Sequence, residues 1–200
     1  ILDARGADAL HAVRAELESQ TRVAALPGDV SDAAHRRALA SAAAELGGLD
    51  AVVNNAGILG PSPQPFLLDY PLDALAEVFR VNTLAPLALL QTLRPAIKPG
   101  AAVINISSDA AVEAYPGWGG YGASKAALEQ LSAVLAAENP AWRVFRVDPG
   151  DMRTQMHQDA FPGEDISDRP LPEASVPGLV ALLTGDFSGG RYRTQELDND

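Results

Sequence analysis

The sequence predicts an α/β fold in which a doubly wound parallel sheet carries helices on both faces. Short, continuous runs of Val, Ile and Leu alternate with helical patterns along most of the 200 residues. Such runs are typical of parallel strands that are buried on both faces. Because crossovers between parallel strands are right-handed, this alternation leads to a doubly wound sheet.

The expected elements follow one another along the chain. We expect strands at residues 1–4, 22–26, 49–54, 101–106 and 143–147. Helices are expected at 7–19, from a cap at Ser31 or Asp32 to residue 46, at 72–97 with an interruption near Pro86, at 122–139 and at 176–183. Residues 151–180 are irregular and rich in proline, which indicates a lid over a substrate site. The chain opens within a strand pattern at Ile1, so we expect it to be part of a longer protein.

Length and composition indicate one domain spanning residues 1–200. The net charge of −11 argues against binding to nucleic acid or to an anionic membrane surface, although an acidic balance is also a common aid to solubility. The absence of cysteine excludes disulfides, thiolate catalysis and Cys-ligated zinc. No apolar run approaches the roughly 20 residues of a membrane helix, and no basic leader opens the sequence. We therefore expect a cytoplasmic protein.

The histidines give no sign of a metal site. His11, His35 and His157 lack metal-ligand spacing, and we expect them to face solvent or to pack. Tyr115, Trp118 and Met156 are plausible pocket walls, but aromatic and Met side chains are more often plain packing.

Tyr121 and Lys125 form the centre of the functional argument. They begin a predicted helix after a buried strand, and their spacing places them one turn apart on the same face. A tyrosine with its ordinary pKa near ~10 is a poor acid or base at neutral pH. We expect the nearby ammonium of Lys125 to lower the pKa of Tyr121. Alone, however, this spacing is more often an accident of an exposed helix face.

Other polar residues follow the predicted strands, where open parallel sheets bind ligands. Ser108 lies thirteen residues before Tyr121 at the end of a strand, where a hydroxyl could bind a substrate carbonyl or simply cap a turn. The sequence Asn54-Asn55-Ala56-Gly57 ends the preceding strand, and its small residues allow close backbone approach or form an ordinary turn. Asn82 lies within a helix among apolar neighbours, and Pro149-Gly150 with Thr154 follows a later strand.

Together these residues resemble the short-chain dehydrogenase/reductase family in order and spacing, over residues 1 to about 155. The resemblance implies a Rossmann-type fold and a carbonyl reductase that transfers hydride between a nicotinamide and a small carbonyl or alcohol substrate. It also implies that the protein forms a homodimer or homotetramer through its long helices. The catalytic residues implied are Asn82, Ser108, Tyr121 and Lys125. The cofactor-binding residues implied are Arg5, Asp29, Val30, Asn54, Ala56, Gly57, Tyr121, Lys125, Pro149, Gly150 and Thr154.

The resemblance assigns a role to each catalytic position. Tyr121 is the acid that protonates the substrate oxygen, and Lys125 lowers its pKa and holds the nicotinamide ribose. Ser108 orients the carbonyl, and Asn82 anchors a water that relays protons to Lys125. Ala4 stands where members that bind NAD carry an acidic residue, with Arg5 just after it. Arginine favours the 2′-phosphate of NADP, so NADP is expected over NAD.

One part of the family pattern does not appear in the sequence. The resemblance implies a glycine-rich phosphate-binding turn about 20 residues before residue 1, together with the first strand and helix. Residues 117–122 match the glycine spacing as letters, but they lie too far behind their preceding strand to serve as that turn. The alternative hypothesis is therefore a non-catalytic binding or regulatory protein with the same fold.

Overall fold

In the computed structural model, which describes residues 1–197, the strands form two parallel sheets. The smaller sheet pairs β1 (Leu2–Ala4) with β2 (Ala25–Pro27). The larger has the order β3-β4-β5-β6, formed by β3 (Leu49–Asn54), β4 (Ile97–Ile106), β5 (Arg143–Asp148) and β6 (Gly190–Arg193). All described strand pairs are parallel, as the sequence predicts. The last three residues of the domain expected at 1–200 lie outside the described residues.

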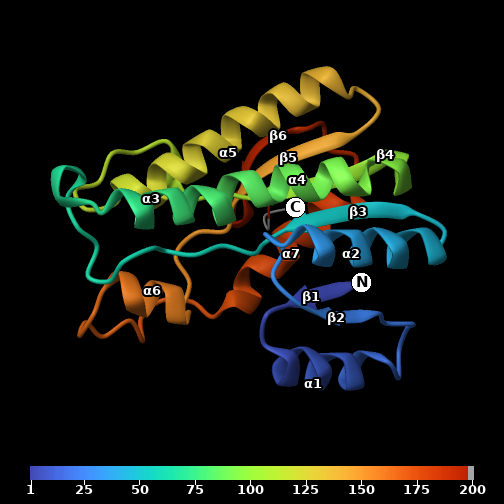
Figure 1. The fold of residues 1–200 in the computed structure, drawn as a ribbon, viewed down its shortest axis with the longest axis horizontal. Helices are drawn as coiled ribbons and strands as arrows, with labels where there is room; N and C mark the ends of the chain where they lie inside the picture. Colours follow the sequence, from blue (N-terminus) through green and yellow to red (C-terminus); the bar gives the residue numbers. More distant parts are fainter. Residues whose placement is uncertain (198–200) are drawn as a thin grey trace.

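Helices cover both faces of the larger sheet (Figure 1). The helices are α1 (Ala7–Leu17), α2 (Ala33–Glu45), α3 (Leu72–Phe79), α4 (Ala85–Leu93), α5 (Gly119–Glu138), α6 (Gln155–Ala160) and α7 (Val176–Thr184). Side chains from α2, α4 and α5 pack against one face, and α7 packs against the other through Leu182. None of the helices in residues 1–197 is long and apolar enough to cross a membrane.

Strand β4 shows why the sheet needs two helical layers. Its alternate residues Ala101 and Val103 belong to the apolar cluster beneath α2 and α4, while Ala102 and Ile104 belong to the cluster beneath α7. Successive side chains of a strand point to opposite faces, so a continuous apolar run buries both. The expected doubly wound arrangement is confirmed.

The helix expected at 72–97 is interrupted near Pro86, as expected, by a π-helical turn at Arg80–Leu84. Its expected end is wrong, because Ile97 already begins strand β4. Pro86 stands within the first two positions of α4 rather than at the break. Proline has no N–H for the preceding turn and crowds the carbonyl four residues earlier, so the turn before it widens.

Smaller differences concern the ends of elements. Strand β2 begins at Ala25, three residues later than expected, and Asp32 caps α2 by accepting a hydrogen bond from the Ala34 amide at 2.8 Å. The sequence pattern did not predict β6, because its four residues contain two arginines and no apolar run. The segment 151–180, expected as a lid, contains α6, an irregular stretch and the start of α7.

Candidate active site

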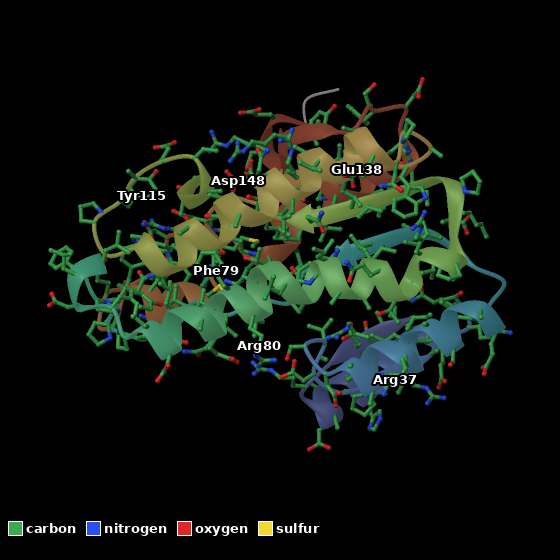
Figure 2. The ribbon with its side chains drawn as sticks, turned by 45° about the horizontal axis from the view of Figure 1, so that its top comes forward. Arg37, Phe79, Arg80, Tyr115, Glu138 and Asp148 are labelled. Atoms are coloured by element: carbon green, nitrogen blue, oxygen red, sulfur yellow. The ribbon has the colours of Figure 1, made fainter. Side chains whose placement is uncertain are left out.

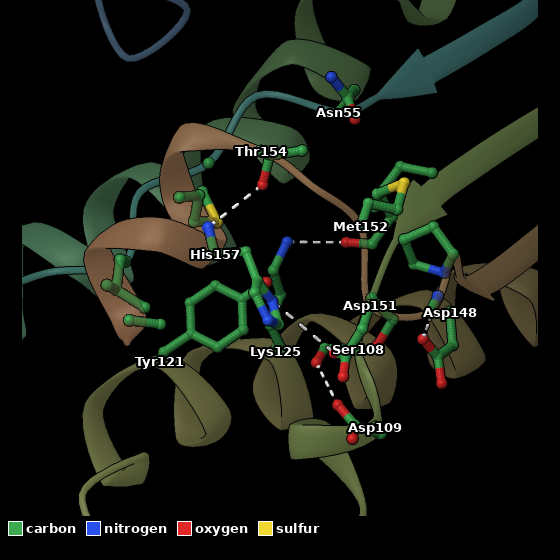
Figure 3. A pocket seen from close by; sticks show the side chains of 18 of the residues that line it. Asn55, Ser108, Asp109, Tyr121, Lys125, Asp148, Asp151, Met152, Thr154 and His157 are labelled. Atoms are coloured by element: carbon green, nitrogen blue, oxygen red, sulfur yellow. Dashed lines mark hydrogen bonds and ion pairs between the residues drawn. The ribbon is translucent and has the colours of Figure 1, made fainter. Parts of the chain in front are cut away.

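A cavity of about 380 Å³ opens where β3, β4 and β5 end (Figure 3). Because the strands are parallel and in register, Asn54, Ile106 and Asp148 bring their following loops to one edge of the sheet. Helices α5 and α6 contribute further walls. The lining residues include Ala56, Gly57, Leu59, Ser108, Asp109, Trp118, Tyr121, Lys125, Pro149, Gly150, Met152, Thr154, Met156 and His157.

Ser108 follows strand β4 and begins a short turn. Its Oγ accepts a hydrogen bond from the Ala110 amide at 3.2 Å and donates one to Asp109 Oδ1 at 2.8 Å. The hydroxyl caps the turn and also faces the cavity. The two roles expected for this serine, capping a turn and binding a substrate carbonyl, are therefore compatible.

Tyr121 and Lys125 lie in the first turns of α5 and both line the cavity, as their spacing predicts. Lys125 is almost fully buried, and its Nζ donates to the carbonyl oxygen of Ile106 at 2.8 Å. The same nitrogen lies 5.6 Å from the centre of the Tyr121 ring. The carbonyl at the end of β4 thus holds the Lys125 ammonium close to the Tyr121 ring.

Burial dominates the protonation of this pair, contrary to the expected effect of Lys125 on Tyr121. Loss of hydration raises the pKa of Tyr121 to about 12, with the carboxylates of Asp109 and Asp148 adding to the rise. Burial lowers the pKa of Lys125 to about 8. Burial disfavours the charged form of each group, so it raises the pKa of an acid and lowers the pKa of a base. At neutral pH Tyr121 is therefore a protonated phenol that can donate its hydrogen.

Asn82 lies behind the cavity in the π-helical turn. Its Oδ1 accepts from the Ile58 amide at 2.8 Å, and its Nδ2 donates to the Ile58 carbonyl at 2.8 Å and to Ser124 Oγ at 3.0 Å. The widened turn thus holds the loop after β3 against α5. Asn82 itself is almost completely buried and is not among the residues that line the cavity.

The residues expected to bind the cofactor fall into two groups. Ala56, Gly57, Pro149, Gly150 and Thr154 line the cavity with Tyr121 and Lys125. Asn54 instead points into the protein, where its Nδ2 donates to Asn105 Oδ1 at 2.7 Å.

The second group lies near the smaller sheet. Arg5 follows β1 and lines a separate cavity of about 480 Å³ that it shares with Gly57. Asp29 accepts hydrogen bonds from the amide and hydroxyl of Ser31, which lower its pKa. Arg80, which is labelled in Figure 2, lies in the π-helical turn, and its Nη1 donates to the Ser31 hydroxyl. Val30 is buried in the core beneath α2 and is absent from the lining of both cavities.

His157 packs, which is one of the two placements expected for it, but it does so in the wall of the cavity. The side chain is buried in the cavity wall, its ring packs 4.9 Å from Phe161, and its Nδ1 lies 3.9 Å from Asp151 Oδ1. Its place is set by the turn of α6, which Thr154 caps, and no sequence spacing signals that placement. Trp118 and Met156 line the cavity, whereas Tyr115 bonds to Asp109 and Glu113 at the surface. Among residues 1–197, no cluster of three or more His, Asp or Glu side chains gathers for a metal.

The arrangement suits transfer of a proton to a carbonyl oxygen. Two hydroxyls, those of Ser108 and Tyr121, reach one cavity, and a buried ammonium lies beneath them. Hydroxyl donors that are held in place stabilise negative charge as it develops on an oxygen.

Comparison with known proteins gives the same picture. A family model described as short chain dehydrogenase matches residues 1–165. The chain is 33% identical over 171 residues to sepiapterin reductase of Bos taurus, covering 79% of this chain and 64% of that protein. It is 34% identical over 164 residues to the (S)-benzoin-forming benzil reductase of Saccharomyces cerevisiae, covering 78% and 60%. The chain thus spans less than two thirds of the length of these two relatives.

A solved structure of similar fold is that of a short chain dehydrogenase from Shigella flexneri complexed with NADP. It superposes with a TM-score of 0.88 at 27% identity and covers 97% of this chain and 85% of that chain.

Proposed function

Because the chain belongs to the short-chain dehydrogenase family, we propose that it is an NADP-dependent reductase of small carbonyl compounds. The observation that carries this proposal is the meeting of Ser108, Tyr121 and Lys125 in one cavity at the carboxyl ends of the strands. Ser108 follows strand β4, whereas Tyr121 and Lys125 lie one turn apart in α5, and each presents a functional group that a carbonyl reduction needs.

In the proposed reaction, Tyr121 donates its phenolic proton to the substrate oxygen. Its raised pKa keeps that proton in place at neutral pH. Ser108 orients the carbonyl and contributes a second hydrogen bond as charge develops on the oxygen. The ammonium of Lys125 favours the phenolate that remains after the proton has left.

The described residues fit a nicotinamide cofactor. A methyl group added at Gly57 would lie 3.2 Å from Asn82 Oδ1 and 3.7 Å from Lys125 Nζ, so the bare glycine keeps the approach to the ammonium open. Gly150 has a φ of +74°, which turns the chain at the opposite wall. When bound, the cofactor supplies the hydride. Arg5 would bind the 2′-phosphate, and the NADP in the Shigella structure supports that choice.

The walls favour a substrate with an apolar, aromatic body. Trp118 packs edge-on against Tyr121, with ring centres 5.9 Å apart, and Leu59, Met152 and Met156 complete an apolar lining. Benzil, for which one relative is named, has such a body, whereas sepiapterin, for which the other is named, is a more polar heteroaromatic ketone, and these two are the first probes to test.

We also propose assembly through the long helices. Leu84 and Val134 expose 55% and 43% of their surfaces on the segments around α4 and α5. Burial of these side chains in a homodimer or homotetramer would remove apolar surface from water. Light scattering coupled to size exclusion tests this, and a monomer at working concentration would contradict it.

The proposed function is tested by fluorescence titration and turnover with both nicotinamides. We expect NADPH to bind more tightly than NADH and to be oxidised in the presence of benzil or sepiapterin. Arg5→Ala should remove most of the preference for NADPH and leave NADH turnover unchanged. Binding of NADPH with no turnover of either probe would favour the non-catalytic alternative, and absence of NADPH binding would overturn the cofactor assignment.

A further inference from the structure

A group of charged side chains centres on Arg191 of strand β6, whose side chain is 26% exposed and whose partners Glu129 and Asp148 are buried. The Nε of Arg191 donates to Glu129 Oε1 at 3.0 Å, and its Nη2 donates to the carbonyl oxygen of Ser108 at 3.2 Å. The same Nη2 lies 3.7 Å from Asp148 Oδ2. One guanidinium therefore contacts three separate elements, and two of these contacts are direct hydrogen bonds.

Glu129 connects this group to the helix of the proton donor. Tyr121, Lys125 and Glu129 follow one another at intervals of four residues, which places them on one face of α5. The Glu129 side chain is 10% exposed, and its Oε1 accepts from Ser107 Oγ at 2.5 Å. Glu129 thus joins α5 to the residue immediately before Ser108.

Asp148 connects the group to the opposite wall of the cavity. It ends β5, and its Oδ1 accepts from the Gly150 amide at 2.9 Å. Its side chain is 3% exposed, and Arg193 lies 3.6 Å from its Oδ2. A carboxylate so deeply buried needs a nearby cation, and Arg191 and Arg193 supply it.

From these contacts we infer that Arg191 is a positioning residue, which holds the Ser108 backbone at a set place relative to Tyr121 and to the Pro149-Gly150 turn. This inference rests on the proposed function, since it concerns the geometry of the same site. The planar guanidinium donates in several fixed directions at once, whereas a lysine ammonium at this place could not reach both Glu129 and the Ser108 carbonyl in the same geometry.

Arg143 provides a matched control. It lies on the adjacent strand β5, and its guanidinium donates to the carbonyl oxygens of Leu182, Leu183 and Gly185 at 3.2, 3.1 and 2.9 Å. It is therefore a well-bonded arginine of the same sheet whose contacts lie away from the cavity. Its removal should lower stability without moving Ser108.

The test compares Arg191→Met, Arg191→Lys, Glu129→Gln and Arg143→Met in the NADPH-dependent reduction of benzil. Misplacement of a reacting group by about 1 Å costs about 100-fold in rate, so we expect a loss of that order in kcat for Arg191→Met. The KM for NADPH should stay near the wild-type value. Arg191→Lys and Glu129→Gln should lose less kcat than Arg191→Met. Arg143→Met should keep the wild-type kcat even if its melting temperature falls as far as that of Arg191→Met.

Hydrogen exchange gives a readout that does not depend on turnover. We expect faster amide exchange at residues 107–110 in Arg191→Lys than in wild type, with no such change in Arg143→Lys. Wild-type kcat in Arg191→Met, or an equal loss of kcat in Arg143→Met, would overturn the inference. If the wild-type protein reduces neither probe, the proposed function fails, and unchanged exchange at residues 107–110 would separately overturn the positioning role. If Arg191→Met does not fold, Arg191→Lys and Glu129→Gln decide by the same criteria.

Discussion

At the residue scale, the chemistry of the site follows from how deeply each polar group is buried. Tyr121 and Lys125 lie close together, yet burial moves their pKa values in the directions that favour the neutral form of each. Tyr121 is consequently protonated at neutral pH and available as a proton donor, and Lys125 changes its charge close to physiological pH.

We predict that kcat/KM for reduction is level below pH 8 and falls above it. The pKa of Lys125 is lowered from 10.5 to about 8, so its ammonium is charged below that pH and neutral above it. Tyr121, with a pKa of about 12, keeps its proton throughout this range. Since kcat/KM reports the free enzyme, the decline should begin near the pKa of Lys125.

The measurement is a pH profile of benzil reduction, with circular dichroism at each pH to show that the fold is retained. A profile that stays level up to pH 10 would contradict the role given to Lys125. A decline that follows the loss of folded protein would also contradict that role, because unfolding and not deprotonation of Lys125 would then cause it.

At the element scale, the distance between Ser108 and Tyr121 depends on how closely α5 approaches the turn after β4. Gly122 lies at this contact, where an added methyl group would be 2.6 Å from the carbonyl oxygen of Ala110. That separation is too short for a real contact, so any side chain at this position forces helix and turn apart. The glycine is needed for close approach, since its φ is not in the left-handed region.

We therefore predict that Gly122→Ala lowers both stability and kcat. In a helix interior, alanine is favoured over glycine by about 1 kcal/mol, so propensity alone would stabilise the variant. A clash with backbone should reverse that sign and separate Ser108 from Tyr121. Ala137→Gly, at an exposed position in the last turn of the same helix, serves as the propensity control and should lose less than about 1 kcal/mol with no change in kcat. A Gly122→Ala protein with higher stability and unchanged kcat would show that the contact is not limiting.

The sequence predicted the elements best where local pattern and burial agree. Strand β3 has the bounds that its apolar run indicates, and α5 contains the whole of the expected range except Asn139. The break near Pro86 falls in the turn before α4, because proline acts on the turn that precedes it. Strand β6 was missed because its pairing with β5, rather than its own residues, makes it a strand.

At the scale of the whole molecule, the sheet is held between two apolar layers, and the site lies at its edge. Phe145 is fully buried in the layer under α7, together with Ile104 and Leu182. Its ring meets Tyr192 of β6 edge-on at 5.9 Å. The same layer therefore supports the strand that carries Arg191.

We predict that Phe145→Ala lowers the free energy of unfolding by about 3–5 kcal/mol, the usual cost of deleting a fully buried aromatic ring. Phe66→Ala removes the same ring from a site that is 65% exposed and should change stability little. Urea denaturation followed by tryptophan fluorescence measures both. Equal effects of the two substitutions would show that the layer under α7 does not carry this stability.

How much of the site the sequence could predict depends on the kind of signal. Ser108, Tyr121, Lys125 and Gly57 were predicted because their order and spacing together resemble those of a known family, and all four line the cavity. The place of His157 in the cavity wall was not predicted, because it is set by packing of α6 against the cavity. Arg191 was missed because its partners are far away in the chain, at 62 and 83 residues of separation.

The most direct test of the central claim is benzil reduction by Tyr121→Phe measured beside NADPH binding to the same protein. The substitution removes the hydroxyl and keeps the ring against Trp118, so binding should be preserved. General acid catalysis contributes about 10²–10⁴-fold, and we predict a loss of kcat in that range with the NADPH dissociation constant unchanged. A Tyr121→Phe protein that reduces benzil at the wild-type rate would contradict the account.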